Sequence, residues 1–424
     1  MLKYFLWIAI VVGSIQNSMA QFSRLFESKT LRLDYYHCGK ADSENFYFGE
    51  LKQEPFWGGS KINLIDNSGF GTYMLEVRSV DSKALLYSHG YSTLFTEWQA
   101  TPEAKAIARC FPEVVIMPFP HEKVLVSISS RNKKGVFEKK FEHLVDPKSH
   151  FINKERENLP VFDIINSGDP AVKVDIVLLS EGYTEDQQQI FKADCQKFAE
   201  EFFTYSPYAQ NKNKFNIRGV WSASKQVGPD IPGDSIWNET RLKSSYYTFD
   251  SERYLMVTDY QGVCDVAANA PYDYIYILSN TDKYGGGAIY NFYGISAAHH
   301  ANETGKIYIH EFGHLFAGLA DEYEGGADYT DLYPLDVEPW EPNLTTLVSF
   351  DKKWKNMLTP GTLIPTAKIE ANNKKLGVFE GGGYISKGVY RPWINCMMNN
   401  MHTIEVFCPV CSKSIQNMID FNCR

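Results

Sequence analysis

The chain has 424 residues, of which 44% are hydrophobic and 22% charged, and its formal net charge is -9. This acidic balance argues against a nucleic-acid-binding protein, which normally carries a basic face. Aromatic residues make up 14% of the chain and the mean hydropathy is -0.31, so a disordered chain and a polytopic membrane protein are both excluded. The length allows two or three domains with sizeable hydrophobic cores.

The first 20 residues are typical of a secretory signal peptide. Lys3 precedes an apolar run over residues 4–12, and small residues ending at Ala20 form a cleavage pattern. The run is shorter than the roughly 20 residues that a membrane-spanning helix needs. We therefore expect an exported protein in the periplasm, on the cell surface or outside the cell, with no membrane span in the mature chain.

Residues 21–150 predict a β-sandwich domain of roughly immunoglobulin-like size. Short alternating or apolar runs, such as 72–77, 113–118 and 124–128, recur between turn residues. A polar, proline-bounded stretch follows, and we expect a linker over residues 151–165.

The remaining residues, 166–424, predict an α/β domain. Residues 174–179, 215–220 and 272–278 predict strands, the first of them buried, and residues 184–203 have the spacing of an amphipathic helix. Strands that alternate with a helix are typical of an α/β layer structure. The whole chain is therefore expected to be a multidomain α+β protein.

All eight cysteines lie in the expected mature part of the chain. The last four are Cys396, Cys408, Cys411 and Cys423, with the spacing C-x11-C-x2-C-x11-C. A four-thiolate zinc site needs such grouping. In an exported chain, however, disulfides or unpaired buried thiols are the favoured interpretation.

The motif H-E-x-x-H carries the chemistry, with His310, Glu311 and His314. Positions four apart share one face of a helix, so both imidazoles can bind one metal ion about 2 Å away. Glu311 can then hold and deprotonate a water on that metal, which is the arrangement of zinc hydrolases.

A third protein ligand must come from beyond the helix. If the helix continued, Asp321 would lie about 10.5 Å beyond His314 and could not share its metal. A break at Gly318 would let the chain fold back and bring Asp321 or Glu322 to the metal. The short Asp321 is preferred, Glu322 is the alternative, and Glu324 is the least favoured.

Two strings resemble a known family: HEFGHLFAGLADEY at residues 310–323, and GGGYISKGVYRPWINCMM at residues 381–398. Together they are similar to the IgA-peptidase-type zinc metallopeptidases of Bacteroides-like gut bacteria, over residues 171–422. The resemblance implies a metzincin-like α/β zinc peptidase domain behind a β-rich N-terminal domain. It implies His310 and His314 as zinc ligands, Glu311 as the base and Asp321 as the third ligand.

Two further features of the second string have open interpretations. Met397 or Met398 could form the Met-containing turn that metzincins place beneath the metal, or simply fill the core. Tyr390 is the candidate for stabilising the oxyanion, since a phenol donor near zinc can do so. Its alternative is an ordinary structural tyrosine.

The predicted function is that of an exported zinc metalloendopeptidase, which hydrolyses peptide bonds of proteins, host glycoproteins or immunoglobulins among them. Its partner is a protein or peptide substrate, with no nucleic acid. The alternative is a cell-surface carbohydrate- or protein-binding protein with a vestigial zinc domain, in which Trp57, Trp98 or Tyr91 would stack against sugars. A third possibility directs the zinc chemistry to a non-protein amide such as a cell-wall peptide.

Overall fold

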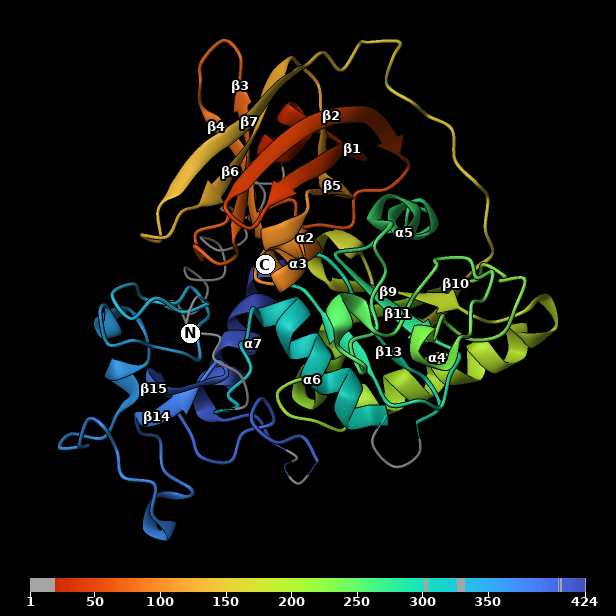
Figure 1. Cartoon of the computed structure of the whole chain (residues 1–424). Helices are drawn as coiled ribbons and strands as arrows, with labels where there is room; N and C mark the ends of the chain where they lie inside the picture. Colours follow the sequence, from red (N-terminus) through yellow and green to blue (C-terminus); the bar gives the residue numbers. More distant parts are fainter. Residues whose placement is uncertain (1–19, 301–303, 326–331, 403, 405, 424) are drawn as a thin grey trace, which may run out of the picture.

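The computed structural model describes residues 20–300, 304–325, 332–402, 404 and 406–423, and Figure 1 shows their arrangement. The predicted signal peptide, apart from Ala20, lies outside the described residues. Two parts follow one another along the chain, an N-terminal domain of antiparallel sheets and a larger α/β domain. The mixed α+β class is therefore confirmed.

The N-terminal domain contains two antiparallel sheets. One has the order β2-β1-β5 and the other β4-β3-β6-β7. The strands are β1 (Phe26–Lys40), β2 (Ser43–Glu54), β3 (Tyr73–Ser79), β4 (Leu85–Tyr91), β5 (Arg109–Pro120), β6 (Val124–Arg131) and β7 (Phe137–Val145). Buried side chains of both sheets, among them Leu33, Val115, Leu75 and Val126, belong to one hydrophobic cluster. The narrower expectation of a sandwich stays a prediction.

The second domain is organised around a six-stranded sheet with the order β12-β13-β11-β9-β10-β8. Its inner strands are parallel, and the two edge strands are antiparallel to their neighbours. The strands are β8 (Val161–Ile165), β9 (Val174–Glu181), β10 (Phe215–Val220), β11 (Tyr274–Ser279), β12 (Gly286–Ala288) and β13 (Gly294–Ala297). Every residue of β9 is buried, as its mostly apolar 174–179 stretch predicted.

Helices cover both faces of this sheet. They are α4 (Gln188–Phe202), α5 (Tyr260–Ala267), α6 (Thr304–Ala317) and α7 (Pro409–Asn422). Side chains of α4, α6 and α7 share one hydrophobic cluster with one face of β9, and α5 shares another with the opposite face. A hairpin of β14 (Phe379–Gly382) and β15 (Ile385–Arg391) lies on the α6 and α7 side (Figure 1).

The sequence predicted these elements with small errors at their ends. The three predicted strands are confirmed as β9, β10 and β11, and the helix expected over 184–203 begins as a single 3-10 turn before α4. The last five residues of the expected linker, 151–165, belong instead to β8, which pairs with β10. In the described part of the chain, no helix combines the length and the apolar character needed to cross a bilayer.

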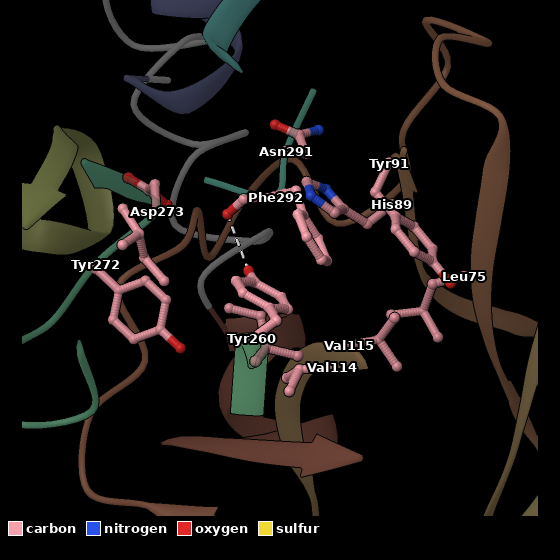
Figure 2. A pocket seen from close by; sticks show the side chains of 12 residues that line it. Leu75, His89, Tyr91, Val114, Val115, Tyr260, Tyr272, Asp273, Asn291 and Phe292 are labelled. Atoms are coloured by element: carbon pink, nitrogen blue, oxygen red, sulfur yellow. Dashed lines mark hydrogen bonds between the residues drawn. The ribbon is translucent and has the colours of Figure 1, made fainter. Parts of the chain in front are cut away.

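The two domains are packed closely on one another. Arg32 of β1 is 1% exposed, and its guanidinium bonds to Asp34 of its own strand and to Asp265 of α5 at 2.7 Å. Short helices α2 (Leu94–Gln99) and α3 (Pro102–Ala106) lie at the same boundary. A cavity of about 30 Å³ lies between the domains, and the Tyr260 hydroxyl donates to the carbonyl of Phe292 at 2.9 Å beside it. Figure 2 shows the side chains that line it. Such a volume has room for ordered water.

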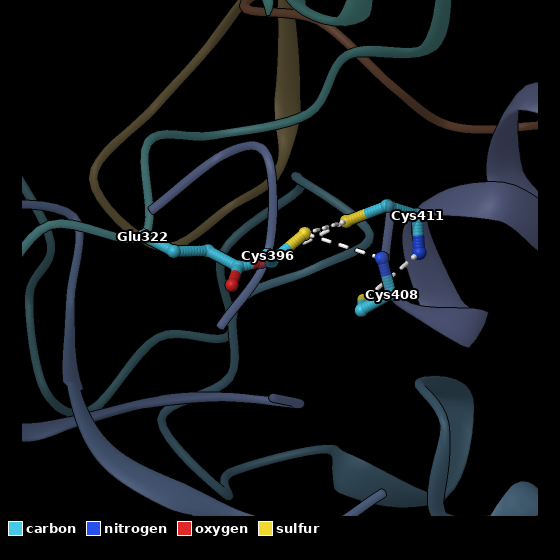
Figure 3. A group of neighbouring side chains, drawn as sticks. All are labelled: Glu322, Cys396, Cys408 and Cys411. Atoms are coloured by element: carbon cyan, nitrogen blue, oxygen red, sulfur yellow. Dashed lines mark hydrogen bonds between the residues drawn. The ribbon is translucent and has the colours of Figure 1, made fainter. Parts of the chain in front are cut away.

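The cysteines divide into one disulfide and six thiols. Cys38 of β1 is bonded to Cys110 of β5, so the bond joins neighbouring strands of the N-terminal domain. Cys396, Cys408 and Cys411 are buried thiols that lie beside Glu322 (Figure 3). The disulfide lies in the N-terminal domain, and none of the last four cysteines is in a disulfide, so their role stays a prediction.

Candidate metal centre

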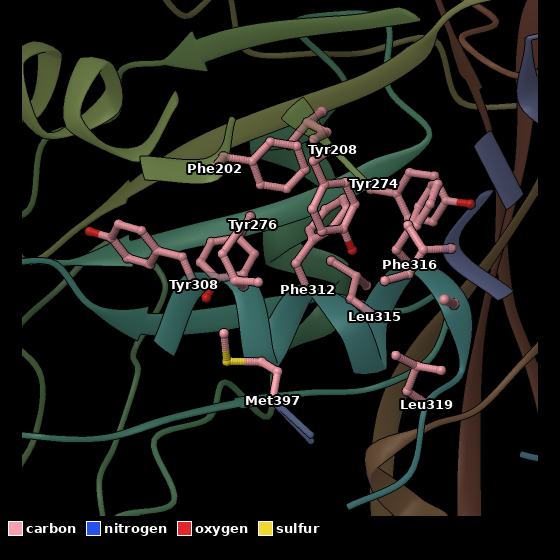
Figure 4. Close-up of a cluster of buried hydrophobic side chains, with 14 of the residues drawn as sticks. Phe202, Tyr208, Tyr274, Tyr276, Tyr308, Phe312, Leu315, Phe316, Leu319 and Met397 are labelled. Carbon is pink, nitrogen blue, oxygen red and sulfur yellow. The ribbon is translucent and has the colours of Figure 1, made fainter. Parts of the chain in front are cut away.

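Aromatic side chains on one face of helix α6 pack into the core and so fix which face of the helix points away from it. The ring of Phe312 packs 4.9 Å from that of Phe202, and the ring of Phe316 packs 4.9 Å from that of Tyr274 (Figure 4). Such edge-to-face pairs stabilise beyond the area they bury. His310 and His314, four residues apart, therefore share a different face of the helix.

The helix ends where the sequence predicts. Ala317 is its last residue, and Gly318 has φ +59°, the left-handed conformation that glycine adopts without strain. The Gly318 N–H donates to the carbonyl of His314 at 3.2 Å, which is the bond of a left-handed helix cap. A Cβ atom at position 318 would lie 2.7 Å from the ring of Trp340. The chain turns back here and brings Asp321 to the histidines.

Three donor atoms converge beside the helix. His310 Nε2 and His314 Nε2 are 3.2 Å apart, and Asp321 Oδ1 lies 3.1 Å from the first and 3.4 Å from the second. Ligand atoms 2.0–2.1 Å from a tetrahedral zinc ion lie about 3.3 Å from one another. The three side chains therefore fit one zinc ion. Glu322, the alternative ligand, points to the cysteines instead.

The backbone sets which nitrogen of each imidazole faces this point. His314 Nδ1 lies 2.6 Å from the carbonyl oxygen of Leu319, and His310 Nδ1 lies 3.2 Å from that of Met397. A carbonyl can only accept, so each Nδ1 carries a proton and each Nε2 is the nitrogen left to bind a metal. Metal-binding histidines are usually oriented in this way.

The charges around the three donors favour a bound cation. Burial lowers the pKa of His314, but the Asp321 carboxylate outweighs it and raises the pKa to about 9. Burial also raises the pKa of Asp321, yet the two histidines hold that pKa far below its usual range. Asp321 Oδ1 is buried and accepts no hydrogen bond among the described residues. A positive charge at this point is therefore stabilised.

Glu311 completes the motif. It is the neighbour of His310 on the helix, and its side chain is partly accessible to solvent. Burial raises the pKa of its carboxyl group, while the charges of His310 and His314 oppose that shift. A carboxylate that is near the ligands and still reachable by water can act as a general base.

Two tyrosines that the sequence did not indicate contact the expected metal ligands. The hydroxyl of Tyr384 donates a hydrogen bond to Asp321 Oδ2, and the ring of Tyr323 stacks on His310 with centroids 6.1 Å apart. Tyr384 lies in the turn between β14 and β15, where it has φ +65°. The glycine run just before it was the only sequence signal for this turn.

Tyr390, the predicted oxyanion donor, lies on β15. Its backbone exchanges hydrogen bonds of 3.0 and 2.8 Å with Thr345, and its side chain packs against the hydrophobic cluster. These contacts describe a structural position, and its catalytic role stays a prediction.

Asn343 is a further residue that the sequence did not indicate. It is fully buried, and its amide accepts from the Ala320 N–H at 2.8 Å and donates to the Ala320 carbonyl at 2.8 Å. It also donates to Glu322 Oε1 at 3.1 Å. Asn343 therefore holds the chain on both sides of Asp321.

The segment that contains Met397 and Met398 passes beneath the helix. The Met397 carbonyl contacts His310, and the Met398 sulfur would lie 3.1 Å from a Cβ atom placed on Gly313. Both methionines are fully buried. Their role as a metzincin-type turn stays a prediction.

The N-terminal domain also reaches towards the site. Glu97 of α2 accepts a hydrogen bond from the hydroxyl of Tyr254. Burial raises the pKa of Glu97 to about 7, and the charges of His314, Glu311 and Asp321 also act on it. The carboxylate of Glu97 is therefore within electrostatic range of the ligands.

The sugar-stacking residues of the alternative function are not at the surface. Trp57 is 6% exposed, Trp98 0% and Tyr91 2%. This part of the sequence prediction is wrong, because large aromatic side chains supply much of the apolar area that a small sheet domain buries.

Comparison with known families gives two matches along the chain. A model described as IgA Peptidase M64 matches residues 162–374 and 367–419, and one described as Peptidase M64 N-terminus matches residues 21–142. No curated protein matches the chain.

Proposed function

The chain belongs to the IgA peptidase M64 family of metallopeptidases, and from this premise we propose that it is an exported zinc endopeptidase that acts on proteins. The geometry of three donor atoms supports zinc as the metal. Two imidazole nitrogens and one carboxylate oxygen converge at 3.1–3.4 Å, with Glu311 beside them. Three protein ligands of this kind are typical of catalytic zinc sites, which leave a position open.

His310, His314 and Asp321 would hold the metal. A zinc ion bound there supplies a Lewis acid, which polarises a peptide carbonyl and makes water easier to deprotonate. The Leu319 and Met397 carbonyls keep both Nε2 atoms turned towards it. Tyr384 holds the second oxygen of Asp321, so that Oδ1 faces the histidines.

Glu311 is the proposed proton carrier. Its carboxylate accepts a proton from the attacking water and gives it to the departing amine, so that one group serves both halves of the hydrolysis. Its place on α6, next to His310, fixes it relative to the ligands. The family description supports a protein substrate, and immunoglobulins or other host glycoproteins are the proposed class.

Replacing Glu311 by Gln tests this assignment. The amide cannot accept the proton, so we expect kcat to fall about 10²–10⁴-fold while zinc stays bound. Casein and immunoglobulin A would be the substrates, and Glu370→Gln is the matched control, because Glu370 is exposed in a separate 3-10 turn. Full activity in the Glu311→Gln variant would refute the mechanism. Bound zinc in a wild-type protein that cleaves neither substrate would count against the peptidase proposal.

Export is tested separately. If the predicted signal peptide is removed after Ala20, the mature protein begins at Gln21. Mass spectrometry of the protein from extracytoplasmic fractions would show that N-terminus. A chain that keeps Met1 and stays in the cytoplasm would contradict this part of the proposal.

A further inference from the structure

A second group of metal-binding side chains lies next to the first. Glu322, Cys396, Cys408 and Cys411 are at most 2% exposed, and one ligand atom from each lies within 4.8 Å of the others (Figure 3). We propose that these four residues bind a second, structural metal ion of the zinc class through three sulfurs and one oxygen. This inference goes beyond the proposed function, because a closed site with four protein ligands leaves no position for a substrate.

The sulfur geometry fits a metal better than a disulfide. Cys396 Sγ and Cys411 Sγ are 3.7 Å apart. Sulfurs bound about 2.3 Å from a tetrahedral zinc ion lie about 3.8 Å from one another, whereas a disulfide brings them to about 2.05 Å. A disulfide between any two of the three thiols would also leave the third beside Glu322 without a partner.

Backbone N–H groups are directed at two of the sulfurs. Cys408 caps the N-terminus of α7, and its Sγ accepts from the Cys411 N–H at 3.4 Å. Cys396 Sγ accepts from the Cys408 N–H at 3.3 Å. N–H donors and the positive end of a helix both stabilise the thiolate that a metal requires. Pro409, which has no N–H, begins the helix without losing a donor.

Among the described residues, the carboxylate of Glu322 forms no ion pair, although the charge of Arg391 acts on it from a distance. Its Oε1 receives the Asn343 amide, but its Oε2 is buried and accepts no hydrogen bond among the described residues. Arg391 forms its ion pair with Glu324, at 3.3 Å, rather than with Glu322. A buried carboxylate is costly unless it is paired or binds a metal. A cation between Glu322 and the three thiolates removes that cost.

This site would stabilise the first one through the backbone. The Glu322 N–H donates to the Met398 carbonyl at 2.7 Å, and the neighbouring Met397 carbonyl orients His310. Asp321 directly precedes Glu322. A metal held by Glu322 and Cys396 would therefore fix both the segment that supplies Asp321 and the segment that positions His310.

Metal analysis of the full-length mature protein tests the proposal. Purified without chelator, the wild type should contain two zinc ions per chain by elemental mass spectrometry. The double variant His310→Ala/His314→Ala should contain one, and Cys408→Ser/Cys411→Ser should lose the other. Cys423→Ser is the matched control and should keep two, because its thiol lies at the far end of α7 and contacts the Lys214 carbonyl.

Cobalt substitution identifies the ligands independently of activity. The histidine double variant, refilled with Co²⁺, should keep the near-ultraviolet sulfur-to-cobalt charge-transfer absorption that only thiolate ligands give. This measurement decides the matter even if the cysteine variant does not fold. A disulfide among these cysteines in non-reducing peptide maps, or wild-type protein without the thiolate band, would overturn the proposal. A thiolate band in a protein without peptidase activity would support this site and count only against the proposed function.

Discussion

Replacing Asn343 by Ala should weaken the catalytic metal site without touching any of the three ligands of that site. The Asn343 side chain is fully buried and makes three hydrogen bonds, two of 2.8 Å to the backbone of Ala320 and one of 3.1 Å to Glu322. These residues lie on both sides of Asp321. The alanine variant therefore releases the segment that carries the third ligand.

The size of the effect follows from the groups left behind. The N–H and carbonyl of Ala320, a residue only 6% exposed, lose their partner. Each unpaired buried polar group costs about 1–3 kcal/mol, so the free energy of unfolding should fall by about 2–6 kcal/mol for the two groups. Loss of a residue that orients a ligand typically lowers metal affinity about 10–100-fold, and we expect that range for zinc.

Two assays separate the stability effect from the effect on the site. Urea unfolding gives the change in stability, and refilling the metal-free protein in zinc buffers gives the free zinc concentration that restores half of the peptidase activity. The matched control is Asn216→Ala. Asn216 of β10 is also fully buried, accepts from the Ser167 N–H at 2.7 Å and donates to Gly168 and Asp175 at 3.0 Å.

Both variants should be destabilised, but only Asn343→Ala should need a higher free zinc concentration to restore half of the peptidase activity. An equal loss of zinc affinity in the two variants would show that general destabilisation, and not the position of Asp321, sets the affinity. Unchanged affinity in Asn343→Ala would refute the reasoning directly.

Three other changes have definite expected outcomes. Tyr384→Phe removes the hydrogen bond to the third ligand and should lower zinc affinity about 10-fold in a chelator competition, whereas an unchanged affinity would contradict that role. Gly318→Ala should lower the free energy of unfolding by about 1–2 kcal/mol because of its left-handed backbone, and by a further amount because the new Cβ meets Trp340. Gly361→Ala, with φ +87° and open space around the new Cβ, should show the backbone cost alone in thermal unfolding. Burial raises the pKa of Glu54 from 4.5 to about 7, so the folded chain binds the proton more tightly than the unfolded chain. The free energy of unfolding of the wild type, measured relative to that of Glu54→Gln, should be highest below about pH 4.5 and should fall by about 3 kcal/mol as the pH rises through 7. A difference between the two proteins that does not change with pH across that window would contradict this prediction.

The parts of the fold that the sequence predicted are those with a local signal. The strand β9 is mostly apolar over residues 174–179, and the break of α6 is at a glycine that can adopt a positive φ. The two histidines and the glutamate occupy fixed positions on one helix, so their spacing alone predicts a metal site. These features depend on residues close together in the chain.

The parts that the sequence missed depend on tertiary contacts. Asn343 bonds to the residues on either side of Asp321, and Tyr384 bonds to Asp321 itself. The two come from separate segments, and neither belongs to a periodic pattern. The cysteine spacing raised a four-thiolate site only as the less favoured interpretation, and in the structure the fourth neighbour of Cys396, Cys408 and Cys411 is Glu322 rather than Cys423. Helix α7 has 14 residues, so at about 1.5 Å per residue it places Cys423 roughly 20 Å from Cys408. Glu322 occupies the place that the spacing suggested for Cys423.

The choice between Asp321 and Glu322 as third ligand is connected to the second group. Successive side chains of a non-helical segment point in different directions, and here Asp321 faces the histidines while Glu322 faces the cysteines. Turning Glu322 to the histidines would remove the only carboxylate from the cysteine group and break its contact with Asn343. The two acidic residues are therefore not interchangeable, and Asp321→Ala should abolish catalytic metal binding even though Glu322 is adjacent. Retention of that metal in Asp321→Ala would show that the segment can rearrange and that the two groups are independent.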